Sequence, residues 1–141
     1  MENQTLFKNL LFATSFFVVA YWTAVFTGLF PVEEIVSGYK NWFMSFPLPD
    51  FYMGICSALA LHYFKDHKKL SGLFAAMAGS GLLFLGLYAL AYGHNTGLLY
   101  ILTIDEIIEI GIKIYCLTVG TFLVRKAWVL VNSENKQRSE P

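Results

Sequence analysis

Four ionisable residues lie within nine positions of an apolar stretch near the C-terminal end of the chain. They are Asp105, Glu106, Glu109 and Lys113. A charged group at the centre of a membrane-spanning helix costs about 2.5–3.5 kcal/mol on insertion scales, so such groups normally face a bundle interior or a water path. Asp105, Glu109 and Lys113 follow one another at intervals of four, which places them on one helical face. Side chains of these types could pair with one another, exchange protons or bind a small cation.

Two interpretations of these four residues are open. In the structural one, Glu109 and Lys113 form a neutralising ion pair, and Asp105 and Glu106 contact water near the outer end of the helix. In the functional one, Asp105, Glu109 and Lys113 line a polar cavity that opens to the outside. Glu106 follows Asp105 by about 100° around the helix and is therefore expected to face a different neighbour.

Asp50 is a fifth candidate. It follows Pro47 and Pro49 at the expected start of a helix. Proline is tolerated in a first helical turn, and an acidic residue there meets the positive end of the helix dipole. Asp50 thus has a structural explanation, and the functional hypothesis places it with Glu106 near the mouth of the pocket.

No other residues form a recognisable chemical motif. The histidines have no partners at metal-ligand spacing, and Cys56 and Cys116 belong to different apolar segments without a Cys-x-x-Cys motif. Phosphate loops, dinucleotide fingerprints and nucleophile elbows are also missing. The sequence therefore predicts no catalytic residue, no metal site and no cofactor, and it favours a non-enzymatic protein without deciding the point.

The elements that must position these residues follow from composition. Of the 141 residues, 56% are hydrophobic and 14% are charged, against about a quarter charged in soluble domains. A spanning helix needs about 20 mostly apolar residues. Four segments qualify, at about residues 10–30, 47–64, 70–92 and 98–123. We therefore expect an all-α polytopic membrane protein, an antiparallel four-transmembrane-helix bundle within a single domain (residues 1–131), followed by a disordered tail (132–141).

Basic residues give the orientation. Eight of the ten fall on the side that would hold both termini and the second loop, whereas Lys40 alone falls on the other side and Lys113 lies within a span. Because cytoplasmic loops carry an excess of lysine and arginine, both termini and the tail are expected in the cytoplasm, with the bundle in the plasma (inner) membrane. The balanced net charge gives no indication of nucleic-acid binding.

Small residues and aromatic residues predict how the bundle packs. Gly72, Ala76 and Ser80 recur every four residues in the third span, and such rows let a second helix approach closely. Packing within the bundle is favoured over a dimerisation face. Trp22 and Trp42 fall towards the outer boundary, where aromatic residues anchor helices at the interface or pack between them.

Two stretches resemble a group of small, uncharacterised four-span bacterial membrane proteins. One runs from Ser45 to Leu48 with Asp50 following; the other is Gly86-Leu87 with Tyr92, Asn95, Gly97 and Tyr100 following. Members of this group often carry an acidic residue near the end of the third span, where this chain has Ala89. The resemblance implies the four-span topology and no activity.

The hypothesis that follows is a small membrane protein with an outward-facing polar pocket. Asp105, Glu109 and Lys113, with Glu106 and Asp50 near the mouth, would bind or pass a small cation, a proton or an amphipathic ligand. The alternative is a structural or accessory subunit, in which the charges and small residues contact a partner membrane subunit or a second copy. A third hypothesis is a lipid-modifying enzyme that uses Glu109 or Asp105 as acid or base. The lipid bilayer is the expected partner in each case.

Overall fold

The computed structural model describes residues 2–101 and 103–138, and it describes side chains for residues 4–101, 103–104 and 106–132. Its elements are α1 (Glu2–Phe26), α2 (Tyr39–Phe43), α3 (Pro47–Tyr63), α4 (Lys68–Thr96), the 3-10 turn η1 (Leu98–Tyr100) and α5 (Ile104–Arg138). The prediction of an all-α protein is confirmed, since all regular elements over the described ranges are helical.

Three helices are long and apolar enough to cross a membrane. Their qualifying segments are Gln4–Phe26, Lys68–Thr96 and Glu106–Asn132, with 23, 29 and 27 residues. These lengths and compositions indicate a membrane protein. The second predicted span, at about residues 47–64, corresponds to α3, which has 17 residues and is not among these three. The count of four spans and their topology therefore stay predictions.

Two helix boundaries differ from those that hydropathy predicted, and a glycine in the left-handed conformation lies at each of them. The first span was expected to end near residue 30, but α1 ends at Phe26 because Gly28 adopts a φ of 77°. The fourth span was expected to begin near residue 98, but Gly97 (φ 79°) and η1 precede α5, which begins at Ile104. Helix α5 continues to Arg138, and the disorder expected for residues 132–141 stays a prediction.

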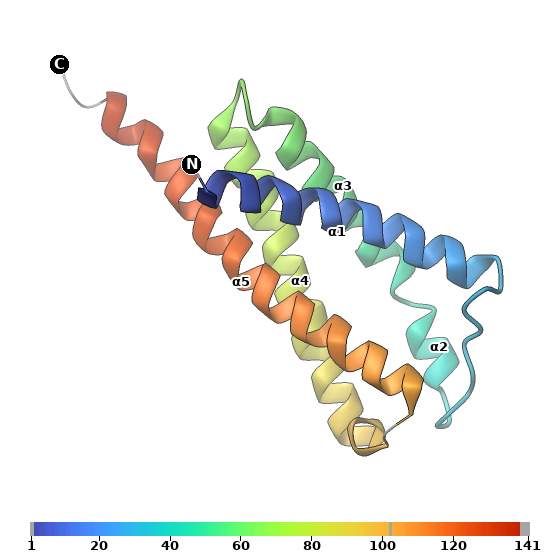
Figure 1. Ribbon diagram of the computed structural model, residues 1–141. Coiled ribbons are helices and arrows are strands. Elements are labelled where there is room, and N and C mark those ends of the chain that lie inside the picture. Colours follow the sequence, from blue (N-terminus) through green and yellow to red (C-terminus); the bar gives the residue numbers. More distant parts are fainter. Residues whose placement is uncertain (1, 102, 139–141) are drawn as a thin grey trace.

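Helices α4 and α5 pack closely through glycines. A Cβ atom at Gly79 would lie 2.9 Å from the carbonyl oxygen of Gly120, and one at Gly120 would lie 2.8 Å from the carbonyl oxygen of Gly79. A Cβ atom at Gly72 would lie 3.2 Å from the carbonyl oxygen of Ala127. The small residues of α4 are thus used within the bundle, and the two helices form an antiparallel pair (Figure 1).

Helix α1 meets α5 only near its own first half. Phe7 and Leu11 are buried in one core together with Leu123 of α5. The hydroxyls of Thr14 and Tyr115 then share a hydrogen bond, with their oxygens 2.8 Å apart. Beyond this point α1 and α5 diverge towards the side that carries α2 (Figure 1). We call the part of the bundle around the first core the inner half.

A second, smaller core lies in the half of the bundle that contains α2, which we call the outer half. It consists of four buried residues from α1, the 39–43 helix and η1: Trp22, Tyr39, Phe43 and Leu98. Asp50, Glu109 and Lys113 line a cavity beside this outer core, together with Trp22 and Phe43. The fold therefore joins a tightly packed inner half to an outer half that holds the site.

Candidate functional site

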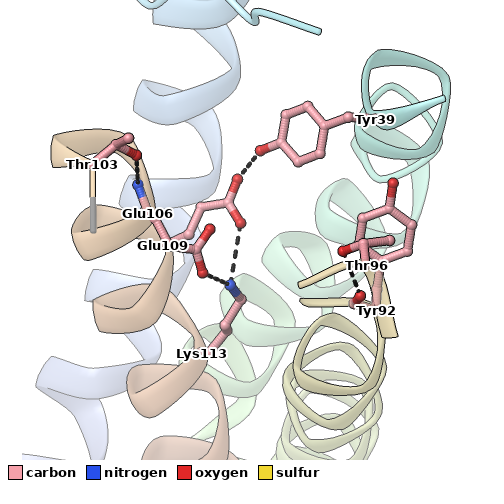
Figure 2. A network of polar contacts seen from close by, with 7 residues as sticks. All are labelled: Tyr39, Tyr92, Thr96, Thr103, Glu106, Glu109 and Lys113. Atoms are coloured by element: carbon pink, nitrogen blue, oxygen red, sulfur yellow. Dashed lines mark hydrogen bonds and ion pairs between the residues drawn. The ribbon is translucent and has the colours of Figure 1, made fainter. Parts of the chain in front are cut away.

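Lys113 is the centre of a buried charge cluster. Its Nζ atom lies 2.7 Å from Oε1 of Glu106 and 3.3 Å from Oε2 of Glu109 (Figure 2). Lys113 is 3% exposed and Glu106 is 2% exposed. One ammonium thus bridges the buried carboxylate of Glu106 and the half-buried carboxylate of Glu109 through charge-assisted hydrogen bonds, which are strong. We call Glu106, Glu109 and Lys113 the charge cluster.

The position of Glu106 corrects the sequence analysis. We expected its carboxylate to face a different neighbour from Lys113, or to contact water, but it forms the shorter of the two ion pairs. The physical reason is that seven residues turn an α-helix by about 700°, only about 20° short of two full turns. Residues 106 and 113 therefore share a face.

Asp105 shares the first turn of α5 with Glu106. Its side chain is outside the described residues. The expectation that Asp105 lines the pocket therefore stays a prediction.

Thr103 fixes the beginning of α5 and with it the position of Glu106. The Thr103 hydroxyl accepts a hydrogen bond from the backbone N–H of Glu106 at 3.2 Å (Figure 2), as an N-cap residue does. The Thr-x-x-Glu spacing is that of a capping box, and it was a sequence signal for the helix start that hydropathy did not detect. Here the glutamate carboxylate pairs with Lys113 instead of turning back to the cap.

Tyr39 of α2 is a site residue that sequence reasoning missed. Its hydroxyl donates a hydrogen bond to Oε1 of Glu109, on the side of the carboxyl group away from Lys113 (Figure 2). Tyr39 is only 4% exposed. Nothing in its spacing links residue 39 to residue 109, and the only available signal was the concentration of aromatic residues between positions 39 and 46.

The loop before α2 holds Tyr39 in place. Gly38 has a φ of 84°. Glu34 accepts hydrogen bonds from the backbone N–H groups of Gly38 and Lys40, at 2.6 and 3.0 Å. The acidic side chain of Glu34 thus orders the turn that presents Tyr39 to the charge cluster.

Asp50 reaches the site from the first turn of α3. Its Oδ2 atom accepts a hydrogen bond from the indole N–H of Trp22 at 2.8 Å. Trp22 is 1% exposed, so it packs within the bundle instead of anchoring α1 at a membrane interface. The dipole explanation for Asp50 is compatible with this contact, because the residue does lie in the first turn of α3.

Trp42 is buried in an aromatic stack and has an unsatisfied donor. Its ring lies parallel to that of Tyr92, with centroids 3.9 Å apart and planes 7° apart. Its buried indole N–H has no hydrogen-bond partner among the described residues. Buried polar groups are rarely left unpaired, so an orphan of this kind calls for an explanation.

Two cavities connect these residues. The smaller, of about 90 Å³, is lined by Asp50, Glu109, Lys113 and Trp42, together with residues of all the helices. The larger, of about 490 Å³, is mostly apolar and lies where α1 and α5 diverge. They have four lining residues in common: Tyr21, Asp50, Ile112 and Cys116. The cavities are therefore neighbours, with Asp50 between them.

The chemistry available in this site is acidic. Among the described residues that line the two cavities, Lys113 is the only basic one, and Glu106 and Glu109 both contact it. Over the described part of the chain, no three His, Cys, Asp or Glu side chains are grouped closely enough to hold a metal ion. The arrangement can accept a cation or hydrogen-bond donors.

Comparison with protein families, curated proteins and solved structures finds no match to this chain. The resemblance to small four-span bacterial membrane proteins thus stays a prediction. The functional argument depends on the site itself.

Proposed function

We propose that this membrane protein holds a ligand pocket inside its helical bundle. The pocket binds or passes a small cation or proton, or binds the polar end of an amphipathic ligand, through Glu109, Asp50 and Lys113. Glu106 pairs with Lys113, and Tyr39 donates a hydrogen bond to Glu109. These two contacts fix the positions and charges of the ligand-binding side chains.

One observation carries the proposal: Asp50, Glu109 and Lys113, from two helices distant in sequence, line the same cavity. A bundle that needed only charge neutrality could have paired Lys113 with a single carboxylate. Instead two glutamates contact Lys113, and Asp50 accepts a hydrogen bond from the neutral Trp22 N–H. Intramembrane ionisable residues in such an arrangement commonly mark substrate or ion pathways.

The topology that goes with this proposal is a four-span bundle in the plasma (inner) membrane, with both termini in the cytoplasm. Seventeen residues in α3 give a length of about 26 Å, close to the lower limit for a span. Lys65 in the turn after α3, Lys68 and Lys69 at the start of α4, and the basic residues of the C-terminal part of α5 support the orientation. The pocket then opens towards the outer side.

The test compares wild type with Glu109→Gln. Glutamine has nearly the same shape and can still accept from Tyr39, and Lys113 keeps its shorter ion pair with Glu106, so the variant is expected to fold. Proton and alkali-cation flux is measured in liposomes. Thermal unfolding is measured with alkali cations, protons, a simple amine and a simple alcohol as probes. A ligand at 100 times its Kd adds about 2.7 kcal/mol to stability, which raises Tm by several degrees.

The expected result is that at least one probe produces flux or raises Tm in wild type, and that Glu109→Gln removes the response. Asp66→Asn is the matched control, because Asp66 is an exposed acidic residue in the turn between α3 and α4. It should respond as wild type does. Equal behaviour of wild type and Glu109→Gln with every probe would contradict the proposal.

The alternative role, as a structural or accessory subunit, draws less support. Gly79 and Gly120 are in contact with each other's backbone, and the charge cluster is paired within the chain. Both features are therefore used in contacts within the chain, and neither needs a partner subunit or a second copy to explain it. Co-purification of a stoichiometric partner that is lost on Glu109→Leu would favour this alternative.

A further inference from the structure

We propose that the natural ligand is an organic ammonium ion with an apolar body, and that it enters the site from the bilayer between α1 and α5. This inference rests on the proposed function and narrows it to one class of ligand. It combines the aromatic lining of the smaller cavity with the shape and position of the larger one.

The first argument is the composition of the smaller cavity. Five of its lining residues are aromatic: Tyr21, Trp22, Trp42, Phe43 and Phe46. Aromatic faces attract a cation that comes within about 6 Å of the ring centroid, and cages of such rings are used to recognise alkylated ammonium groups. An alkali ion would require oxygen ligands, whereas this cavity is walled mainly by rings and aliphatic groups.

The second argument is charge. Asp50, Glu106, Glu109 and Lys113 carry a formal charge of −2 when all four are ionised. A buried charge is normally paired, and no other basic residue is found in the lining of either cavity within the described part of the chain. A ligand cation next to Asp50 and Glu109 would reduce this excess.

The third argument is size. The smaller cavity, of about 90 Å³, is well below the volume of a small-molecule site and has room for the polar end of a ligand. The larger cavity, of about 490 Å³, is within the range of roughly 300–1,000 Å³ for small-molecule sites. Because Asp50 lines both, one ligand can place its charge beside Asp50 and its body in the larger space.

The fourth argument is access. The larger cavity is lined by Phe17 of α1 and by Ile108 and Ile112 of α5, and these side chains are 59%, 42% and 40% exposed. They belong to two helices that are long and apolar enough to cross a membrane. An opening flanked by exposed apolar residues at membrane depth faces acyl chains, so an apolar ligand body would enter sideways.

The orphan N–H of Trp42 fits the same ligand. Trp42 lines the smaller cavity, and its buried indole nitrogen has no partner among the described side chains and backbone. A hydroxyl or carbonyl oxygen near the ammonium nitrogen of the ligand would satisfy it.

The experiment is photo-crosslinking in lipid nanodiscs with two matched probes. One is decylamine with a diazirine at the end of its alkyl chain, and the other is decanol with the same diazirine. Labelled residues are located by peptide mass spectrometry. The expected result is that the amine labels α1 near Phe17 and α5 near Ile108, that unlabelled decylamine competes, and that the alcohol labels these positions about tenfold less, the effect of one charge-assisted hydrogen bond.

Two variants test the two parts of the ligand. Asp50→Asn should lower labelling by the amine about tenfold and leave labelling by the alcohol unchanged, whereas Asp66→Asn should change neither. Gly111→Leu should lower labelling by both probes at these positions, because Gly111 lines the larger cavity and a Cβ atom there meets open space. Circular dichroism and unfolding of each variant verify that it is folded.

Four outcomes would overturn the inference. Equal labelling by the alcohol would make the larger cavity a site for lipid chains in general. Labelling that resists competition, or that lies on exposed residues such as Phe12, would mean partition into the bilayer only. A Glu109-dependent response to protons or alkali cations without specific amine labelling would overturn this inference and leave the proposed function standing. If neither the Glu109-dependent response nor specific amine labelling is observed, both this inference and the proposed function are overturned.

Discussion

The inner and outer halves of the bundle are built on opposite principles. In the inner half, α4 and α5 touch through the backbones of Gly79 and Gly120, and residues such as Leu123 and Ala127 are 0% and 1% exposed. In the outer half, the buried Glu106 and Lys113 form ion pairs together with the half-buried Glu109, and two cavities separate the helices where this half meets the inner core. Close packing holds one half, whereas ion pairs and aromatic contacts hold the other.

The difference explains where this small chain can hold a ligand cavity without losing its packing. Helices in lipid associate through close packing and polar contacts more than through the hydrophobic effect. The glycine contacts of α4 and α5 fix these helices to each other, so α1 is free to stand away from the start of α5. The open space that results is lined by Asp50 and Glu109, and the fold keeps it without losing the bundle.

The largest expected effect is that of Lys113→Met. Methionine has a similar length but no charge, so Glu106 and Glu109 would be left facing each other without a cation. Removing one partner of a buried ion pair costs about 3–5 kcal/mol. We expect a loss of stability of this size, measured as the midpoint of unfolding in mixed micelles. Lys40→Met, at an exposed position in α2, should change stability by less than about 0.5 kcal/mol.

The triple variant Lys113→Met with Glu106→Gln and Glu109→Gln sharpens this test. It removes the buried charges together and should recover most of the lost stability, because replacing a whole buried ion pair is often close to neutral. If Lys113→Met alone were as stable as wild type, the charge cluster would not hold the outer half together.

The next effect is that of Gly120→Ala in the inner half. The new methyl group would lie 2.8 Å from the Gly79 carbonyl oxygen and 2.9 Å from Cγ of Leu83, so α4 and α5 must move apart. Overpacking of this kind costs about 1–3 kcal/mol. Gly111→Ala is the matched variant on the same helix, where a Cβ atom meets nothing within 4 Å.

Gly111→Ala should stabilise the protein by up to about 1 kcal/mol, because alanine restricts the unfolded chain more than glycine does. Opposite signs for the two substitutions, measured by the same unfolding assay, would establish the contrast between a packed inner half and an open outer half. Destabilisation of equal size at both positions would contradict it.

The sequence predicted those features that depend on composition and on short-range spacing. Hydropathy located the long apolar helices, and the four-residue spacing of Glu109 and Lys113 predicted their contact, which the structure contains. The row of small residues in the third span predicted packing within the bundle, as found at Gly72. Each of these signals is local, because a helix relates residues three or four positions apart.

The sequence could not predict contacts that depend on how the helices are placed. The contact between Tyr39 and Glu109 joins positions 70 residues apart, and it exists because the Gly38 turn brings α2 over the start of α5. The bond between Trp22 and Asp50 depends likewise on the crossing of α1 and α3. Helical geometry could have predicted the ion pair between Glu106 and Lys113, because residues seven positions apart share a face. The prediction considered only the four-residue spacing.

The smallest effect that we expect is that of Thr103→Ala, which removes the N-cap of α5. Loss of an N-cap costs about 1 kcal/mol, and here it loosens the turn that carries Glu106. Amide hydrogen exchange should therefore speed up at residues 104–107 and stay unchanged around Gly79. Thr118→Ala is the control on the same helix, since the exposed Thr118 hydroxyl bonds only to carbonyl groups of its own helix; it should leave exchange at both places unchanged. Thr103→Ser keeps the capping hydroxyl and should behave as wild type. If Thr103→Ala accelerated exchange equally in both halves, the outer half would not be the separately stabilised region that its contacts describe.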